Sequence, residues 1–409
     1  MEARPIGRLT LQKQSALNAP GPGERAVMAM RRILIVVASL SLAAAGIQFA
    51  SAEAPGAALR LRQGFWLCGL GHNSRQCSSL VVRAQDSFGK ESPWPPGELL
   101  ERCWTPQALA GTDQELKSVR SHTRFDLAAL KQEPLPPATP VPQELRGSIR
   151  GVELPPGAKL MALTFDLCEA DGDVAGYDGR IVDLLRAQGV KATFFAGGKW
   201  METHKERAEQ LIADPNFEIG SHGLRHLDLA HASDQSFAEE IGLTEAAHAR
   251  VRKSLLARQC TAGAKAPGPL PERMSLMRFP YGRCSAKSLA AVADAGLLAI
   301  QWDLVTGDPD PRQSAKAIAN TILARAHPGA IIVAHANGRG YHTAEALALA
   351  LPKLKEQGYA FVTVSELLKA GKPVIEANCY LTRPGDMPRL ARSTRHRSHD
   401  NWTFLRRNR

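Results

Sequence analysis

The pattern of apolar and polar positions becomes regular from residue 159 onward. Short apolar runs occupy residues 159–165, 192–196, 217–220, 276–279, 298–302, 330–334 and 360–364. Between them lie segments of helical period at residues 179–188, 237–256, 286–295, 314–326 and 343–357. Such alternation is typical of βα units around a parallel sheet. Seven runs favour a closed or nearly closed β/α barrel, and an open doubly wound sheet is the alternative, because local periodicity cannot show closure.

The chain before this pattern is less regular. A proline cluster, "EPLPPATPVPQ", predicts a linker at residues 133–150, because proline runs form extended polyproline II and resist packing. Residues 53–132 form an N-terminal extension with no clear period, and we assign it no role. We expect the β/α domain to occupy residues 151–370 and a basic tail to follow at 371–409.

Residues 1–52 have the features of an export signal. Arg31 and Arg32 precede the apolar run 33–45, which is too short to span a bilayer comfortably, and residues 50–52 supply an A-x-A cleavage pattern. We expect a secreted protein in the periplasm or outside the cell, with no stable membrane span after cleavage. An uncleaved leader that anchors the chain is the alternative.

The positive charge lies mostly at the two ends of the chain. The formal net charge is +11, but residues 1–52 carry an excess of four positive charges and residues 380–409 an excess of six. Only +1 remains for the stretch between them. Because the middle of the chain is electrostatically ordinary, we do not expect a nucleic-acid partner.

Cysteine usage fits an exported chain. Export makes disulfides possible, and the odd total of 7 leaves at least one thiol free or paired with another chain. None of the spacings forms a zinc-binding CxxC pair. The seven cysteines are Cys68, Cys77, Cys103, Cys168, Cys260, Cys284 and Cys379.

Polar residues follow the apolar runs just where each expected strand ends. In a parallel barrel the carboxyl ends of all strands share one face, so residues distant in sequence converge there. One mouth would then collect Asp166, His222, His226, Tyr281, Asp308 and His335.

These residue types suit hydrolysis assisted by a metal ion. The histidines of "SHGLRHL", His222 and His226, suit zinc or another first-row divalent ion, although H-x-x-x-H alone is a weak signal. Asp166 can accept a proton from a water that a cation makes more acidic, and His335 can donate one to a leaving amine. A turn or cap residue and a buried structural histidine are the respective alternatives.

Two further segments can support that chemistry. Arg278 in "RFPYG" can hold Asp166 by a charge-assisted bond, and the turn at Tyr281 can offer a backbone N–H to an oxyanion, unless it is a plain turn. Asp308 in "TGDPDP" can orient His335, although Asp-Pro pairs also occur in ordinary loops.

The ordered set "LTFD", "SHGLRH", "RFPY", "WDLVTGD" and "IIVAH" resembles the five motifs of the polysaccharide deacetylase family with the NodB homology domain, which is similar to carbohydrate esterase family 4. The resemblance covers roughly residues 158–370. It implies a distorted (β/α)7 barrel that hydrolyses non-peptide carbon–nitrogen bonds. The expected partner is an acetylated polysaccharide or oligosaccharide. The expected cofactor is a divalent metal, zinc first and cobalt, nickel or manganese as alternatives.

The resemblance also implies roles for particular positions. Asp166 matches the catalytic base, Arg278 the residue that positions it, His222 and His226 the metal ligands, Tyr281 the oxyanion amide, and His335 the general acid with Asp308 as its partner.

One position departs from the family pattern. Most members have a second aspartate where this chain has Leu167, and leucine cannot ligate a metal. We expect Glu169 as the third ligand, with Asp171, Asp173 or water as alternatives. A disulfide between Cys168 and Cys284 can brace the mouth, and two unpaired thiols are the alternative.

Three functions therefore compete. The first is a secreted metal-dependent carbohydrate deacetylase acting on N-acetyl or O-acetyl groups. The second is a weakly active or silent glycan-binding protein on the same fold, because Leu167 removes a ligand. The third is a hydrolase of small amides. The sequence does not name the glycan or the oligomeric state.

Overall fold

A computed structural model describes residues 98–121, 128, 137–262, 270–384 and 386. All described residues belong to the second of two units into which the chain divides, the unit that begins at Val82. The expected export signal, residues 53–97 of the N-terminal extension and residues 387–409 of the basic tail lie outside the described residues.

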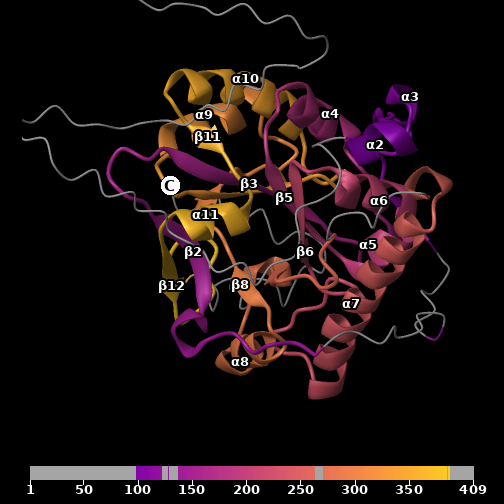
Figure 1. The fold of residues 1–409 in the computed structure, drawn as a ribbon. Coiled ribbons are helices and arrows are strands. Elements are labelled where there is room, and N and C mark those ends of the chain that lie inside the picture. The colour runs from indigo at the N-terminus through magenta and orange to yellow at the C-terminus, as the bar shows by residue number, and fades with distance from the viewer. Residues whose placement is uncertain (1–97, 122–127, 129–136, 263–269, 385, 387–409) are drawn as a thin grey trace, which may run out of the picture. The chain divides into compact units, whose positions relative to one another are not determined.

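A curled, mainly parallel sheet forms the centre of the second unit (Figure 1). Neighbouring strands along the path β2-β8-β7-β6-β5-β3-β10-β9 are all parallel. The strands are β2 (Ser148–Glu153), β3 (Leu160–Leu167), β5 (Ala192–Ala196), β6 (Phe217–Ser221), β7 (Leu276–Met277), β8 (Leu298–Ile300), β9 (Leu304–Val305) and β10 (Ile331–His335).

The segment that contains β8 and β9 closes the curl. β8 pairs with β7 on one side and with β2 on the other, and the chain then turns through residues 301–303. Beyond that turn, β9 pairs with β10 at the other end of the path. Gly151 of β2 also forms an isolated antiparallel bridge with Ala330, next to β10. The distorted (β/α)7 barrel is therefore confirmed, and the chain does not form an open doubly wound sheet.

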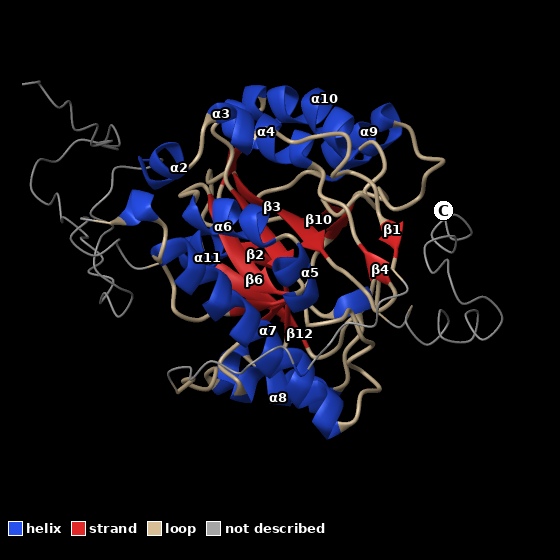
Figure 2. Ribbon diagram, turned by 90° about the vertical axis from the view of Figure 1, so that its right-hand side faces the viewer, coloured by secondary structure: helices blue, strands red, loops and turns tan. Residues whose placement is uncertain are grey.

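Helices cover the outside of the strands, as Figure 2 shows. All five helices expected from the periodicity are present, with ends within three residues of the expected ones. Side-chain caps fix several starts: α7 begins at Asp234 because the Ser233 hydroxyl accepts the N–H of Ser236. The helices that follow β3 are α4 (Gly179–Ala187), α5 (Gly198–Thr203), α6 (Lys205–Ala213), α7 (Asp234–Leu256), α8 (Ala286–Asp294), α9 (Ala315–Arg325), α10 (Thr343–Glu356) and α11 (Val364–Ala370).

The last expected strand is mostly not a strand. Only β11 (Ala360–Phe361) is extended, and it pairs with β3. Thr363 and Glu366 form a capping box that starts α11 at Val364. Two reciprocal hydrogen bonds at the helix start outweigh the β preference of the apolar run.

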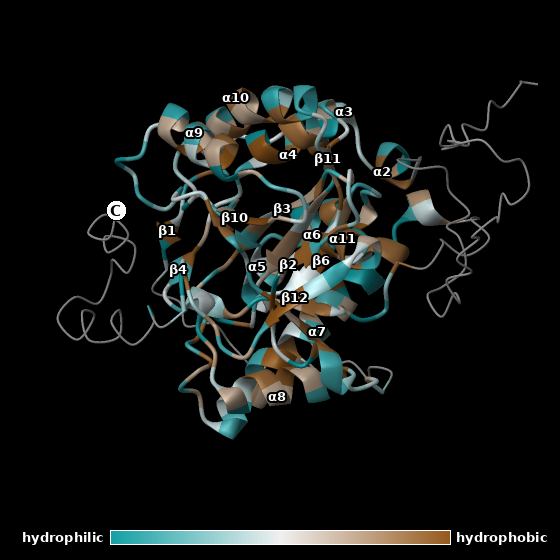
Figure 3. Ribbon diagram, turned by 90° about the vertical axis from the view of Figure 1, so that its left-hand side faces the viewer, coloured by the Kyte–Doolittle hydropathy of each residue, from teal (hydrophilic) through white to brown (hydrophobic). Residues whose placement is uncertain are grey.

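The alternation of side chains in β3 sorts the core into two layers. Met161, Leu163 and Phe165 pack in a cluster that includes apolar side chains of the surrounding helices, whereas Ala162 packs in a separate cluster. Figure 3 shows largely hydrophobic central strands and helices with mixed hydropathy around them. Because successive residues of a strand point to opposite faces, Asp166 lies on the face of Ala162 and Leu167 on the helix-packed face.

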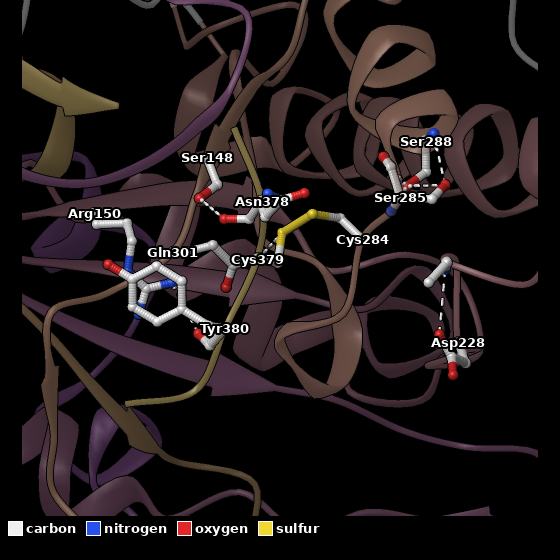
Figure 4. The surroundings of a disulfide bond; sticks show 11 residues. Ser148, Arg150, Asp228, Cys284, Ser285, Ser288, Gln301, Asn378, Cys379 and Tyr380 are labelled. Atoms are coloured by element: carbon white, nitrogen blue, oxygen red, sulfur yellow. Dashed lines mark hydrogen bonds between the residues drawn. A yellow bond between two sulfur atoms is a disulfide. The ribbon is translucent and has the colours of Figure 1, made fainter. Parts of the chain in front are cut away.

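The folded unit extends beyond residue 370. β12 (Lys372–Glu376) pairs antiparallel with β2, and Cys379 forms a disulfide with Cys284. The indole N–H of Trp302 donates to the carbonyl of Leu381 at 2.9 Å. Figure 4 shows this disulfide beside Gln301, whose amide lies 3.5 Å from the Cys379 sulfur. The first part of the expected basic tail therefore covers the barrel.

Part of the N-terminal extension also packs on the barrel. Leu99 and Trp104, in and just after α2 (Glu98–Cys103), pack with Leu255 of α7. Cys103 forms a disulfide with Cys260. α3 (Pro106–Leu109) follows, and β1 (Val119–Arg120) pairs with β4 (Asp173–Val174). The short 3-10 turns are η3 (Gln143–Leu145), η4 (Gln259–Thr261) and η5 (Pro280–Gly282).

Within the described part of the chain, none of the helices combines the length and the apolar character that a membrane crossing requires.

Candidate active site

Asp166 lies near the carboxyl end of β3 and is held by a buried arginine. Nη1 of Arg278 donates to Asp166 Oδ1 at 2.9 Å, and Nη2 donates to the carbonyl of Gln301 at 3.1 Å. The Arg278 guanidinium also lies 4.1 Å from the centre of the Phe195 ring. Burial alone would raise the pKa of Asp166, but its interactions with His222 and the Arg278 guanidinium outweigh burial and lower that pKa below its usual value. Asp166 is thus a carboxylate at neutral pH.

His222 follows β6 and points its free nitrogen at Asp166. Its Nδ1 lies 2.9 Å from the carbonyl oxygen of Arg278, which can only accept, so Nδ1 carries the proton. Nε2 then carries the lone pair and lies 3.6 Å from Asp166 Oδ2. Burial lowers the pKa of His222, so the ring is neutral and can ligate a cation.

His226 lies beside His222 and Tyr281, and His226 and Tyr281 each lie in a tight turn. Its ring centre is 5.1 Å from that of His222 and 4.3 Å from that of Tyr281. His226 and Tyr281 both have left-handed backbones, with φ of 58° and 59°. Non-glycine residues in this region cost about 1–3 kcal/mol and gather at functional sites. Burial, together with the neighbouring His222 ring, holds the pKa of His226 well below its usual value.

His335 ends β10 and is fixed by Asp308. Its Nδ1 lies 3.0 Å from Asp308 Oδ1, and its backbone N–H donates to Oδ2 at 2.7 Å. The hydroxyl of Thr343 also donates to Oδ2, at 2.8 Å. Burial would lower the pKa of His335, but the Asp308 carboxylate outweighs it and raises that pKa above its usual value. His335 therefore keeps its proton to a higher pH than an ordinary imidazole does.

The barrel brings the two proton-transfer candidates side by side. His335 and Asp166 are register partners on adjacent parallel strands, β10 and β3. The sequence placed them at one mouth only through the assumption that the sheet closes. Their register depends on strand pairing, which no local pattern reveals.

The structure does not bring Glu169, expected as the third metal ligand, to the histidine pair. Its carboxylate accepts the N–H of Ala175 at 3.0 Å and the hydroxyl of Thr203 at 2.9 Å. It also lies 3.3 Å from the ammonium of Lys199. The Asp173 carboxylate, an alternative ligand, accepts a hydrogen bond from Arg339 at 2.6 Å.

Cys168, and not the expected Glu169, lies beside the histidine pair. The ligand atoms of Cys168, His222 and His226 all lie within 4.8 Å of one another. No other group of three or more such residues within the described ranges could share an ion. Two imidazoles and a sulfur are donors that zinc and cobalt accept. The donor set therefore fits a divalent metal of this kind.

The expected bridge between Cys168 and Cys284 does not form, because Cys284 is joined to Cys379. Cys168 is the one free thiol among the described cysteines, and Cys68 and Cys77 lie outside the described residues. Burial and the charge of Asp166 raise the pKa of Cys168 to about 12. The Asn337 amide donates to the Cys168 sulfur at 3.0 Å and to its carbonyl at 2.8 Å.

Sequence reasoning missed both Cys168 and Asn337. Period-2 alternation from Asp166 was the available signal for Cys168, since it places residues 166 and 168 on one face. Asn337 begins the segment "NGRGYHT", which follows β10, and nothing local distinguishes it from a loop residue.

A carboxylate, Asp166, and an imidazole, His335, thus lie near a pair of histidines, and these residue types suit metal-assisted hydrolysis. A polysaccharide deacetylase family model matches residues 153–300. A peptidoglycan-N-acetylglucosamine deacetylase of Bacillus cereus is 31% identical over 222 residues, which are 53% of this chain and 92% of that protein. A chitooligosaccharide deacetylase of Bradyrhizobium is 28% identical, over 52% of this chain and 91% of that protein.

Among solved structures, a peptidoglycan N-acetylglucosamine deacetylase in complex with a hydroxamate-type benzamide is 25% identical, with a TM-score of 0.45. The match covers 55% of this chain and 93% of that one. The chain belongs to the polysaccharide deacetylase family, a family of hydrolases that act on carbon–nitrogen bonds of polysaccharides.

Proposed function

We propose that this protein is an exported, metal-dependent carbohydrate deacetylase that hydrolyses acetyl groups on a glycan. The observation that carries the proposal is the register pairing of Asp166 with His335 at the mouth that also holds His222 and His226. The neighbouring strands β3 and β10 thus hold a proton acceptor and a proton donor side by side.

The electrostatics support opposite roles for these two residues. Arg278 holds the pKa of Asp166 below its usual value, whereas Asp308 raises the pKa of His335. These shifts favour the ionised carboxylate of Asp166 and the protonated imidazole of His335. Titratable groups whose pKa values are pushed apart in this way mark acid and base assignments.

The reaction then follows from this chain's own residues. A divalent cation held by His222 and His226, when bound, polarises the acetyl carbonyl and makes a water more acidic. Asp166, oriented by Arg278, accepts the proton of the attacking water. The N–H of Tyr281 donates to the carbonyl oxygen as it becomes negative. His335, oriented by Asp308, protonates the leaving sugar nitrogen, and acetate and a free amine are released.

The substrate class rests on the named relatives. Both curated relatives described above act, by name, on N-acetylated glucosamine polymers or oligomers. We therefore propose an N-acetylated glycan of the peptidoglycan or chitin-oligosaccharide type, with an O-acetylated glycan as the second choice.

Two disulfides in the described residues support export. Cys103–Cys260 and Cys284–Cys379 join segments distant in sequence. Disulfides persist in oxidising compartments such as the periplasm or the cell exterior. We propose that residues 1–52 direct the chain there and that zinc is the resident metal.

Acetate release from N-acetylglucosamine oligomers and from peptidoglycan tests the proposal. We expect turnover that a chelator removes and that Asp166→Asn abolishes in protein that circular dichroism shows to be folded. Undiminished turnover in the double variant Asp166→Asn with His335→Ala would overturn it.

A glycan-binding protein without turnover is the second candidate, because Leu167 stands where most family members carry a ligand. Calorimetric binding of the same oligomers without acetate release would favour it. Release of acetate from small amides alone would instead favour a small-amide hydrolase.

A further inference from the structure

We propose that Cys168 is the third protein ligand of the metal, so that this chain holds its cation with one thiolate and two imidazoles. The inference rests on the proposed function, because it assumes that the histidine pair binds a metal. It replaces the missing carboxylate at position 167 with a donor from the next residue, which lies on the face of Asp166.

The first support is the length of β3. The strand continues through Leu167, whose backbone pairs with Ala196 of β5. The Leu167 side chain is consequently fixed in the apolar cluster that includes helical side chains, with no exposed surface. The following residue, Cys168, returns to the face of Asp166. The same strand therefore directs Leu167 into the apolar cluster and Cys168 toward the histidines.

The second support is distance. Zinc binds imidazole nitrogen at about 2.0–2.1 Å and thiolate sulfur at about 2.3 Å, so tetrahedral ligand atoms lie roughly 3.5 Å apart. The three donor atoms of Cys168, His222 and His226 are already within 4.8 Å of one another. Small side-chain rotations can close the remaining gap. Glu169 would first have to leave Lys199 and Thr203.

The third support is the surroundings of the sulfur. The amide of Asn337, a residue with no exposed surface, donates to Cys168 Sγ at 3.0 Å. An amide donor stabilises a thiolate more than a thiol, and metal ligands are commonly held by such neighbouring groups. The same amide holds the Cys168 carbonyl at 2.8 Å, which fixes the backbone at the strand end.

The ligand set has a consequence for metal choice. A thiolate carries the same single negative charge as the carboxylate that it replaces, so the total charge of the ligand set is kept. Thiolate favours zinc and cobalt over magnesium and manganese, which prefer oxygen donors.

Cobalt spectroscopy on the full chain tests the inference without relying on activity. We expect wild type to bind one Co²⁺ with a near-ultraviolet sulfur-to-cobalt charge-transfer band. Cys168→Asp should keep the cobalt and lose the band. His222→Ala should lose both. The double variant Cys68→Ser with Cys77→Ser is the matched control and should keep both.

Asn337→Ala adds a second readout. It should weaken cobalt binding by about 10–100-fold, as loss of a group that supports a metal ligand commonly does, while the band remains.

The cobalt experiment distinguishes a wrong ligand assignment from a wrong deacetylase proposal. Cobalt bound by wild type without a thiolate band, or a band that persists in Cys168→Asp, would overturn the ligand assignment and leave the deacetylase proposal standing. No cobalt binding by wild type, together with acetate release that a chelator does not affect, would overturn both.

Discussion

At the scale of single residues, the site depends on charges that are buried and paired. Arg278 has no exposed surface, and its partner Asp166 is 4% exposed. A buried ion pair contributes little net stability, but a buried charge that loses its partner is strongly destabilising. The pairing therefore accounts for both the low pKa of Asp166 and the sensitivity of the barrel interior to substitution at position 278.

Arg278→Met should destabilise the protein by about 3–5 kcal/mol, because it leaves the Asp166 carboxylate buried without its partner. Denaturant unfolding measures this loss. The double variant Arg278→Met with Asp166→Asn should be clearly more stable than Arg278→Met alone, since the uncompensated charge is gone. Equal stabilities would show that Arg278 acts only through packing on Phe195.

Asp308→Asn should move the alkaline limb of the rate profile. Asp308 raises the pKa of His335, and His335 donates its proton only in its charged form. Removing the carboxylate lowers that pKa, so kcat/KM for acetate release should begin to fall at a lower pH than in wild type. Asp310→Asn is the control, because Asp310 pairs with Arg312. An unchanged alkaline limb in Asp308→Asn would contradict the role of Asp308.

At the scale of elements, caps and strand ends decide where each side chain points. Ser233, Ser285 and Thr363 fix the first turns of α7, α8 and α11. The continuation of β3 through Leu167 turns Cys168 toward the histidines.

Helix α7 also buries two titratable groups one turn apart, Glu245 and His248. Burial raises the pKa of Glu245 and lowers the pKa of His248, so it favours the neutral form of each.

Glu245→Gln should stabilise the protein increasingly as pH rises. Burial raises the pKa of Glu245 to about 7, against a usual value of about 4.5 in the unfolded chain. Between these values the folded state binds more protons, so wild-type stability falls as pH rises, by at most about 3 kcal/mol. Thermal unfolding from about pH 5 to about pH 8 should show the variant gaining on wild type. A constant difference would mean that Glu245 stays ionised beside Arg273.

At the scale of the folded unit, segments from both flanks complete the barrel. Residues 372–376 add β12 to the sheet, and Leu381 accepts the indole N–H of Trp302. Leu99, Leu100 and Trp104 pack against Leu255 of α7. Each flank is joined to the barrel by a disulfide, Cys103–Cys260 or Cys284–Cys379.

Cys284→Ser with Cys379→Ser should lower the free energy of unfolding by about 2–4 kcal/mol, because the open chain regains conformational freedom when unfolded. The bridged residues are 95 apart in sequence, which makes the closed loop long. Denaturant unfolding of this variant and of wild type reduced with dithiothreitol checks the effect. If the variant matched oxidised wild type, the bridge would be a passive contact.

The sequence by itself determined the type of most elements and the chemistry available to them. Periodicity indicated the strands and the five helices, and the positions of Asp166, His222, His226 and His335 after apolar runs indicated one mouth. These are local properties, since side-chain period and composition are written in consecutive residues.

Only the tertiary structure decided which distant groups meet. The register of β10 with β3, the pairing of Cys284 with Cys379, and the capture of Glu169 by Lys199 and Thr203 all depend on contacts between segments far apart in the chain. Nothing local fixes them, because the free energy that selects one pairing over another comes from packing and closure of the whole barrel. Cys168 became a candidate ligand for the same reason.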